Sequence, residues 1–437
     1  MGYIPPDALA NLKKYSYKSV DKSLLSRHVL NPYWTWLVTL WPTWVAPNVI
    51  TLSGLCMVLI NFATLVYYDP NYLAEKGGAT GPPQWVYFTW AAGLFIYQSL
   101  DAIDGKQARR TGMSGPLGEM FDHGCDALNT TLEVILAGRA LGLGRSWWTV
   151  ASQAASLANF YLTTWEEYHT GQLYLGVFSG PVEGILMIVG IYVISGIFGP
   201  AFWDTPTLTF FGIDKVPIIT KYIPNKGLND AVMALGGVVL AVNIITSYIN
   251  VYKARAAAKE SVLSPLLYLL PFPMTVALQV AWLSSPSFSR SFIINSPLFM
   301  PFLCAWGLQF AHQVGRMILA HVSKQPFPWW DWMWIWSVVG ALDANMPRLF
   351  NRAPFIQHSP DNVRIFIYAT LAVSLLSYTR FVTLVIKDIT NYLGNCLLHR
   401  QEEGPVRILE KGSVGGQDER GQEAIEKYRS NILLDES

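Results

Sequence analysis

Four aspartates stand at helical spacing in one short stretch of the chain. Asp101 and Asp104 are three residues apart, which places both side chains on one face of a helix. Asp122 and Asp126 are four residues apart and share a face in the same way. Residues 112–116 lie between the two pairs and contain Gly, Ser and Pro, which predict a tight turn. The sequence therefore predicts two antiparallel helices that bring four carboxylates face to face.

Carboxylates gathered in this way point to divalent cations. Like charges a few ångströms apart repel one another, and hard oxygen ligands suit Mg²⁺, Mn²⁺ or Ca²⁺. Gly105 and Ala108 share the first face and Gly118 shares the second, which leaves room for a phosphate-bearing ligand close to the backbone. A single pair would favour ordinary helix-end aspartates that face water. Four at these spacings, interleaved with small residues, favour a metal site.

The composition places these helices in a membrane. Of the 437 residues, 51% are hydrophobic and only 14% are charged, and the mean hydropathy is +0.28. Soluble domains carry about a quarter charged residues, so lipid is the expected solvent. The net charge of +1 gives no field that would recruit nucleic acid. The four cysteines are scattered without a C-x-x-C pair, which argues against a structural zinc or a disulfide framework.

Apolar stretches of roughly 20 residues, long enough to cross a bilayer, recur along the chain. We expect spans near 45–67, 84–103, 122–143, 147–165, 181–199, 229–251, 262–284, 294–320, 328–344 and 363–394. The predicted fold class is therefore all-α, a polytopic membrane protein with about ten transmembrane helices. Residues 28–41 mix aromatic and polar side chains and predict an N-terminal amphipathic helix in the membrane interface.

Basic residues predict the orientation of these spans. Lys and Arg gather at residues 13–27, 106–110 and 253–259, which fall on one face when ten spans are assumed. Because cytosolic loops carry the excess of basic residues, this face is expected to be cytosolic. It would hold both termini and the aspartates.

Four regions follow from this reading. Residues 1–44 form a cytosolic N-terminus with the interfacial helix, and 45–200 form the core that carries the aspartates. Residues 201–397 add further transmembrane helices, and 398–437 form a polar cytosolic tail that we expect to be disordered.

The aspartate run resembles the signature of the CDP-alcohol phosphotransferase family, D-x2-D-G-x2-A-R-x8-G-x3-D-x3-D. The match holds at every fixed position, namely Asp101, Asp104, Gly105, Ala108, Arg109, Gly118, Asp122 and Asp126. The resemblance implies that the four aspartates hold two Mg²⁺ or Mn²⁺ ions, which grip the pyrophosphate of a CDP-linked donor. It also implies a nucleotide pocket lined by Gly105, Ala108, Arg109 and Gly118. Asn48, at the start of the first span, would lie near the donor, although Asn48 also fits an ordinary helix cap.

Two further stretches, 164–171 and 179–184, resemble the choline/ethanolamine phosphotransferase branch of that family. The branch implies transfer of phosphocholine or phosphoethanolamine from CDP-choline or CDP-ethanolamine to the hydroxyl of diacylglycerol, with CMP as the second product. It further implies a membrane of the endoplasmic reticulum or Golgi, and it is compatible with a homodimer. The sequence does not distinguish choline from ethanolamine.

The reaction needs a base for the acceptor hydroxyl, and three residues are candidates. Asp126 is the family's usual choice. His123 stands beside the acidic stripe and has an imidazole suited to proton transfer near neutral pH. Glu183 begins the fifth span, where a first-turn acid is also favoured by the helix dipole. Our hypothesis takes His123 as the base with Glu183 assisting it.

Two other functions remain open at this stage. An enzyme that uses CDP-diacylglycerol and a soluble alcohol would carry the same aspartates, although the two branch stretches and the number of spans argue against it. A divalent-cation or solute transporter would also place carboxylates in spans. The acids gather at one boundary rather than across the midplane, which disfavours a transport path.

Overall fold

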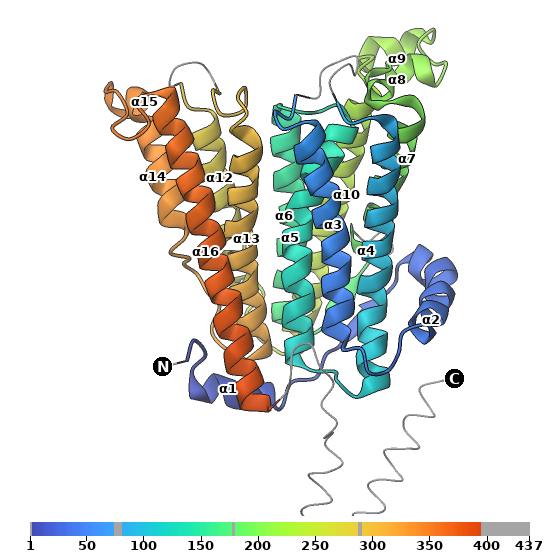
Figure 1. Ribbon diagram of the computed structural model, residues 1–437, viewed down its shortest axis with the longest axis vertical. Helices are drawn as coiled ribbons and strands as arrows, with labels where there is room; N and C mark the ends of the chain where they lie inside the picture. Colours follow the sequence, from blue (N-terminus) through green and yellow to red (C-terminus); the bar gives the residue numbers. More distant parts are fainter. Residues whose placement is uncertain (1, 74–80, 177–179, 287–290, 395–437) are drawn as a thin grey trace, which may run out of the picture.

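The protein is a bundle of long helices (Figure 1). The computed structural model describes residues 2–73, 81–176, 180–286 and 291–394. The expected C-terminal tail from residue 398 lies outside the described residues. The all-helical membrane architecture predicted from composition is confirmed.

The part of the chain before residue 200 contains the helices that carry the predicted site. Its elements are α1 (Pro6–Leu12), β1 (Ser19–Asp21), η1 (Ser26–Leu30), α2 (Asn31–Thr39), α3 (Pro47–Tyr68), α4 (Gln84–Thr111), α5 (Pro116–Ala140), α6 (Trp147–Thr170), β2 (Leu173–Leu175), η2 (Gly180–Gly184) and α7 (Ile185–Phe198). Local sequence explains the ends of these helices. Pro47 and Pro116 start α3 and α5, where a missing N–H costs nothing. Gly112 and Gly171 end α4 and α6 with φ of 67° and 74°, a left-handed conformation that favours glycine.

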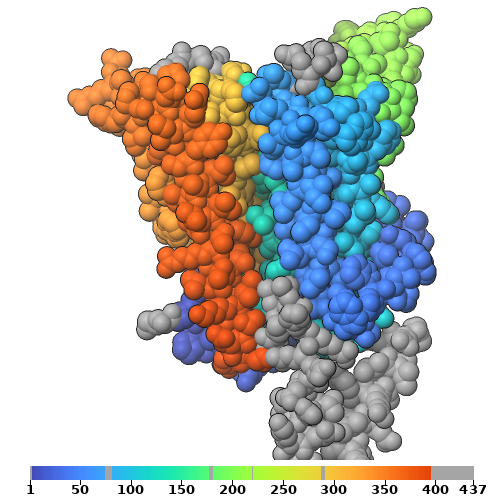
Figure 2. All heavy atoms as spheres, viewed as in Figure 1, coloured from blue at the N-terminus to red at the C-terminus, as the bar shows by residue number. Residues whose placement is uncertain are grey.

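The part after residue 200 adds a second group of helices. Its elements are η3 (Pro200–Asp204), α8 (Thr207–Phe210), α9 (Pro217–Tyr222), α10 (Leu228–Ala257), α11 (Ser264–Leu267), α12 (Pro271–Leu283), α13 (Phe299–Val322), α14 (Trp334–Ala344), α15 (Met346–Phe350) and α16 (Pro360–Leu393). Helix α10 packs on α6 beside the core, whereas α12, α13, α14 and α16 form a neighbouring group (Figure 1). In Figure 2, the gold and orange atoms of this group lie to the left of the blue atoms of α3 on the face shown.

Helix α13 joins the two groups because it packs against α5, α6 and α16. Gly307 lets α13 approach α5 closely, since a Cβ at this position would lie less than 3.0 Å from the side chain of Thr131. Gly93 of α4 meets Asn61 of α3 in the same way. Small residues at such crossings are the usual means of close helix packing in membranes.

Among the residues that the structure describes, five helical segments are long and apolar enough to cross a membrane. They are Pro47–Tyr68, Pro181–Phe198, Leu228–Ala257, Ser264–Leu283 and Pro360–Leu393. The other expected spans coincide with α4, α5, α6, α13 and α14, which are more polar or, for α14, shorter. The polar residues on α4 and α5 include the four aspartates themselves. These acids lower the mean hydropathy of both helices. The number of crossings stays a prediction.

The aspartate-bearing turn, α1 and the end of α16 lie at one end of the bundle, opposite α8, α9 and α15 (Figure 1). The backbone N–H of Ile4 donates to Asp388 of α16 over 2.9 Å, which fixes the N-terminal segment there. The described N-terminal residues and the end of α16 therefore share one side of the bundle, and the chain after residue 394 lies outside the described residues. The assignment of that side to the cytosol stays a prediction.

The N-terminal segment runs across this end of the bundle before it reaches α2. Within the described residues, the strands are β1 and β2, which pair in parallel with Val20 opposite Tyr174. Helix α2 confirms the helix expected within 28–41, and it packs beside α4, where Lys106 donates to Asn31 over 2.7 Å. Trp36 on α2 and Leu40, which directly follows this helix, are more than half exposed, as an interfacial helix requires, although the depth of α2 in a membrane stays a prediction.

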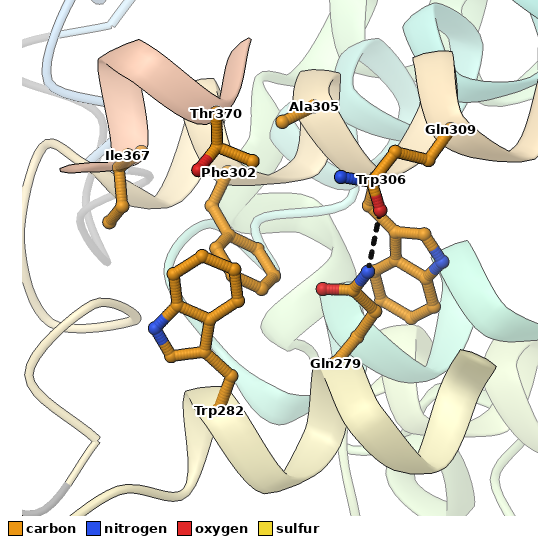
Figure 3. A pocket seen from close by; sticks show the side chains of 8 residues that line it. All are labelled: Gln279, Trp282, Phe302, Ala305, Trp306, Gln309, Ile367 and Thr370. Carbon is orange, nitrogen blue, oxygen red and sulfur yellow. Dashed lines mark hydrogen bonds between the residues drawn. The ribbon is translucent and has the colours of Figure 1, made fainter. Parts of the chain in front are cut away.

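A small pocket lies in the second group of helices, away from the aspartates (Figure 3). Its lining comes from α12, α13 and α16 and includes Trp282, Trp306 and Thr370. The side-chain amide of Gln279 donates to Gln309 over 3.1 Å at its edge. No residue predicted for the site lines this pocket, so we treat it as part of the packing of α12 against α13.

Candidate active site

Three of the four predicted aspartates converge in the structure. One carboxylate oxygen from each of Asp101, Asp122 and Asp126 lies within 4.8 Å of the other two. Asp101 comes from α4, and the other two come from consecutive turns of α5. All three side chains are half-buried, so a ligand from solvent can reach them. The antiparallel pairing predicted from their spacing therefore produces an acidic cluster, which we call the aspartate cluster.

The aspartate cluster fits a divalent cation. The Oδ1 atoms of Asp101 and Asp122 are buried and have no hydrogen-bond partner. Buried carboxylate oxygens without donors are rare in folded proteins, because their lost hydration is not replaced. A bound Mg²⁺ or Mn²⁺ would replace it with the ligand chemistry that these ions prefer. The metal ions that the resemblance implies and the donor atoms of this cluster thus agree.

Asp104 lies beside the aspartate cluster and not among its three converging oxygens. Its side chain is 9% exposed and accepts a hydrogen bond from the Thr51 hydroxyl of α3. Asp126 similarly accepts a hydrogen bond from the Tyr97 hydroxyl of α4. The Thr51 and Tyr97 hydroxyls restrict the rotation of these two carboxylates. Helix α3 thus orients Asp104 of α4, and α4 orients Asp126 of α5.

The small residues of the motif form an accessible surface next to the carboxylates. Gly105, Ala108 and Gly118 are half-buried. A Cβ on Gly118 would lie 4.0 Å from Oδ1 of Asn48, so the buried start of α3 faces the small stripe of α5. Arg109 is exposed at the end of α4, and a Cβ on Gly105 would lie 3.7 Å from its guanidinium. Asn48 therefore lies close to Gly118, and Arg109 lies close to Gly105, while the nucleotide pocket itself stays a prediction.

The two residues of our base hypothesis occupy different surroundings. His123 is 8% exposed on α5, and at roughly 100° per residue it lies about 40–60° to one side of the face that Glu119 and Asp126 share. Glu183, 4% exposed in η2, accepts hydrogen bonds from the Ser23 hydroxyl over 2.6 Å and from the Leu25 N–H over 3.3 Å. The N-terminal segment thus positions Glu183.

Two tyrosines of the N-terminal segment reach the same end of α5. The hydroxyl of Tyr15 donates to Glu119. Tyr17 lies outside the spans, and partial burial of this 45% exposed side chain together with the nearby carboxylates of Glu167 and Asp122 raises its pKa well above the usual value. The Tyr17 hydroxyl therefore remains protonated at neutral pH, and the segment covers one side of the acidic site.

Sequence reasoning missed several of these residues. Tyr97 precedes Asp101 by four residues on α4, so the same helical periodicity that found the aspartates could have found it. Thr51 follows Asn48 by three residues on α3 and carries the same kind of signal. Tyr15 and Tyr17 gave no signal, because their contacts with α5 and α6 bridge about a hundred residues or more of sequence.

Comparison with known proteins gives one consistent result. Residues 44–211 match the family model described as CDP-alcohol phosphatidyltransferase. Cholinephosphotransferase 1 of Saccharomyces cerevisiae is 36% identical over 409 residues, which cover 90% of this chain and 96% of that protein. Choline/ethanolaminephosphotransferase 1 of the same yeast is 40% identical over 75% of this chain and 81% of its own length. Ethanolaminephosphotransferase 1 of Homo sapiens is 29% identical over 89% of this chain and 92% of its own length.

Proposed function

This chain belongs to the CDP-alcohol phosphatidyltransferase family, and from that premise we propose that it transfers phosphocholine or phosphoethanolamine from a CDP-alcohol to diacylglycerol. The products are the phospholipid and CMP. The observation that carries the proposal is the aspartate cluster, whose orphaned oxygens suit a cation that neutralises a pyrophosphate. The relatives' names, which combine cholinephosphotransferase and ethanolaminephosphotransferase, supply the substrate class.

The donor occupies the surface formed by the small residues. Asp101, Asp104, Asp122 and Asp126 would hold two Mg²⁺ or Mn²⁺ ions, which supply charge neutralisation for the pyrophosphate when bound. Gly105, Ala108 and Gly118 allow the phosphates to approach the helix backbone. Arg109, exposed beside them, pairs with the nucleotide's phosphate, and Asn48 orients the cytidine side of the donor.

The transfer itself is a displacement at phosphorus. The acceptor hydroxyl oxygen forms a bond to the β-phosphorus, the bond from that phosphorus to the bridging oxygen breaks, and CMP leaves with that oxygen. His123 takes the proton of the acceptor hydroxyl. Glu183, which Ser23 and Leu25 hold in place, is the assisting residue of this hypothesis. Asp126 is the alternative base. We prefer His123, because Asp126 already converges with the other carboxylates and accepts the Tyr97 hydroxyl.

The same proposal gives the protein its place in the cell. The active-site end, with the start of α1 and the end of α16, faces the cytosol, where CDP-alcohols are soluble. The host membrane is the endoplasmic reticulum or Golgi, and the enzyme is compatible with a homodimer. Residues 45–200 form the catalytic core, and residues 201–397 contribute the supporting helices.

A donor competition assay tests the substrate class. Protein in lipid nanodiscs is given diacylglycerol with CDP-choline or CDP-ethanolamine, and phospholipid product is measured with and without CDP-diacylglycerol as competitor. We expect product from at least one CDP-alcohol and no strong inhibition by CDP-diacylglycerol. Phosphatidyl transfer from CDP-diacylglycerol to a soluble alcohol would assign the enzyme to the other class. Cation flux in liposomes without any transfer would favour the transporter.

A further inference from the structure

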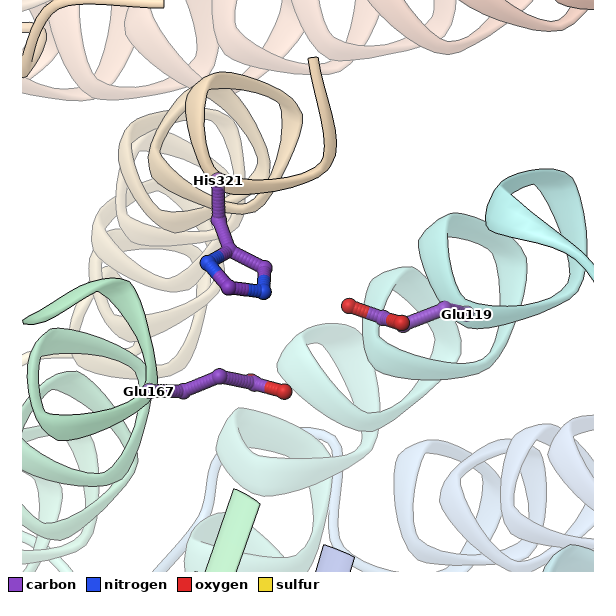
Figure 4. Close-up of side chains that lie close together, drawn as sticks. All are labelled: Glu119, Glu167 and His321. Carbon is purple, nitrogen blue, oxygen red and sulfur yellow. The ribbon is translucent and has the colours of Figure 1, made fainter. Parts of the chain in front are cut away.

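A second cluster of ligand-type side chains lies at the active-site end of the bundle (Figure 4). It consists of Glu119 from α5, Glu167 from α6 and His321 from α13, and we call it the Glu–Glu–His cluster. One ligand atom from each residue lies within 4.8 Å of the other two. The three side chains are 7%, 2% and 5% exposed, so they are more deeply buried than the aspartate cluster.

Burial makes this arrangement costly without a further partner. Oε1 of Glu119 is buried and has no hydrogen-bond partner, while Oε2 accepts the Tyr15 hydroxyl. In Figure 4 the carboxylate of Glu119 is turned toward Glu167 and His321. Buried acceptors are almost always satisfied by a donor, water or an ion. The carboxylate that carries the unpartnered oxygen thus faces two other side chains of metal-ligating type.

Neighbouring protein charges do not complete this cluster. Lys324 acts on both carboxylates electrostatically, but its side chain is exposed. Among the described residues, no ion pair within 4.0 Å joins Lys324 to Glu119 or Glu167. His123 approaches His321 and contributes no negative charge. Two buried carboxylates therefore share their site with one imidazole and lack a close cation.

We propose that Glu119, Glu167 and His321 bind a divalent transition-metal ion of the Zn²⁺ type, at a site separate from the aspartate cluster. Two carboxylate oxygens and one imidazole nitrogen are ligands that Zn²⁺ takes at about 2.0–2.2 Å, with water in a fourth position. Ligands at that distance in a tetrahedron are roughly 3.3–3.6 Å apart. In the structure the three ligand atoms lie within 4.8 Å of one another. The flexible Glu side chains need to move by only about 1 Å to bring the ligand atoms to the tetrahedral spacing.

The ligand types separate this site from the aspartate cluster. An all-oxygen set of aspartates suits Mg²⁺, whereas an imidazole favours zinc and its neighbours in the first transition row. The ion would also tie α5 and α6 of the core to α13 of the second group of helices, three to four turns along α5 and α13 from the Gly307 contact with Thr131. Its predicted role is to fix α13 against the catalytic core at the active-site end.

Zinc titration of the full chain tests this proposal. Purified protein in nanodiscs is stripped with a chelator, saturated with millimolar Mg²⁺ to fill the aspartate cluster, and titrated with Zn²⁺ by calorimetry. We expect about one Mg²⁺-resistant Zn²⁺ per chain, and Co²⁺ at the same site should give a visible absorption band. Absence of Mg²⁺-resistant binding in the unaltered protein would overturn the proposal without any variant.

Matched variants assign the binding to its residues. Glu167→Gln and His321→Gln should each weaken Zn²⁺ binding by at least about tenfold. Glu166→Gln is the control on α6, because Glu166 instead accepts from Asn250 over 2.8 Å, and Zn²⁺ binding should be unchanged. Asp122→Asn should also keep its Zn²⁺. Equal zinc affinity in Glu167→Gln, His321→Gln and the unaltered protein would place the ion elsewhere and refute the assignment.

Discussion

Replacing Asp122 with Asn should change stability in opposite directions with and without Mg²⁺. Asp122 shares the aspartate cluster with Asp101 and Asp126, and their oxygens lie within 4.8 Å. Two unit charges at 4.8 Å repel by roughly 3.5 kcal/mol at an effective dielectric constant of about 20. The substitution to Asn removes two of the three repelling pairs while it keeps the side-chain shape.

Proton uptake by the metal-free cluster relieves most of this repulsion, so the net gain from Asp122→Asn in chelator should be about 1–2 kcal/mol. Unfolding entropy of about 2.1 cal/mol/K per residue, scaled to the 437 residues, converts this gain into a rise of roughly 1–2 °C in the melting temperature. With Mg²⁺ at about 100 times its dissociation constant, each bound ion stabilises the unaltered protein by about 2.7 kcal/mol. The variant loses this gain and becomes the less stable protein.

The assay is thermal unfolding in nanodiscs with chelator and with Mg²⁺, together with transferase activity. Activity of Asp122→Asn should fall at least about a thousandfold, because the ion and its charge neutralisation are lost. Glu133→Gln is the matched control on α5, since Glu133 is buried, accepts from Tyr192 over 2.6 Å and lies outside the cluster. The difference in melting temperature between Glu133→Gln and the unaltered protein should have the same sign with chelator and with Mg²⁺. Equal Mg²⁺ stabilisation of Asp122→Asn and the unaltered protein would refute the reasoning.

Three further predictions follow from particular contacts. His123→Ala should lower the transfer rate by about 10²–10⁴-fold while Mg²⁺ stabilisation persists, and full activity would return the role of base to Asp126. Asp69→Asn should lower the free energy of unfolding by about 3–5 kcal/mol, because Arg139 stays buried and loses its ion-pair partner at 2.8 Å. A melting temperature unchanged from that of the unaltered protein would contradict this prediction. Gly307→Ala should destabilise the protein by about 1–3 kcal/mol, because the added methyl group clashes with Thr131. Gly190→Ala is the control and should not destabilise it, because a Cβ there meets no atom within 4 Å. Equal melting temperatures of these two variants would refute the packing argument.

The helical periodicity of the sequence was sufficient to predict the aspartate cluster. Asp101, Asp122 and Asp126 needed only the three- and four-residue spacings and a turn between two helices. Asp104 was predicted on the same stripe, yet its bond to Thr51 sets it beside the converging oxygens. The helical period predicts on which face of a helix a side chain lies. The contacts that the side chain makes depend on the neighbouring helix, as the bond of Asp104 to Thr51 shows.

Long-range pairings explain what the sequence did not reveal. Strand β1 pairs with β2, and their residues are separated by about 150 positions, so neither short stretch carries a local strand signal. The Glu–Glu–His cluster draws on three helices, and His321 lies far from both glutamates in the chain. Composition was sufficient to predict the membrane class, because lipid as solvent changes the residue content of every span.

The most direct test of the proposed activity follows both products of one reaction. Purified protein in nanodiscs receives diacylglycerol and a CDP-alcohol labelled in its headgroup, with Mg²⁺ or with chelator, and CMP and labelled phospholipid are measured together. The account predicts Mg²⁺-dependent appearance of phospholipid and CMP in equal amounts with CDP-choline, CDP-ethanolamine or both, and the ratio of rates gives the headgroup preference. No labelled phospholipid from either donor with folded protein and Mg²⁺ would contradict it.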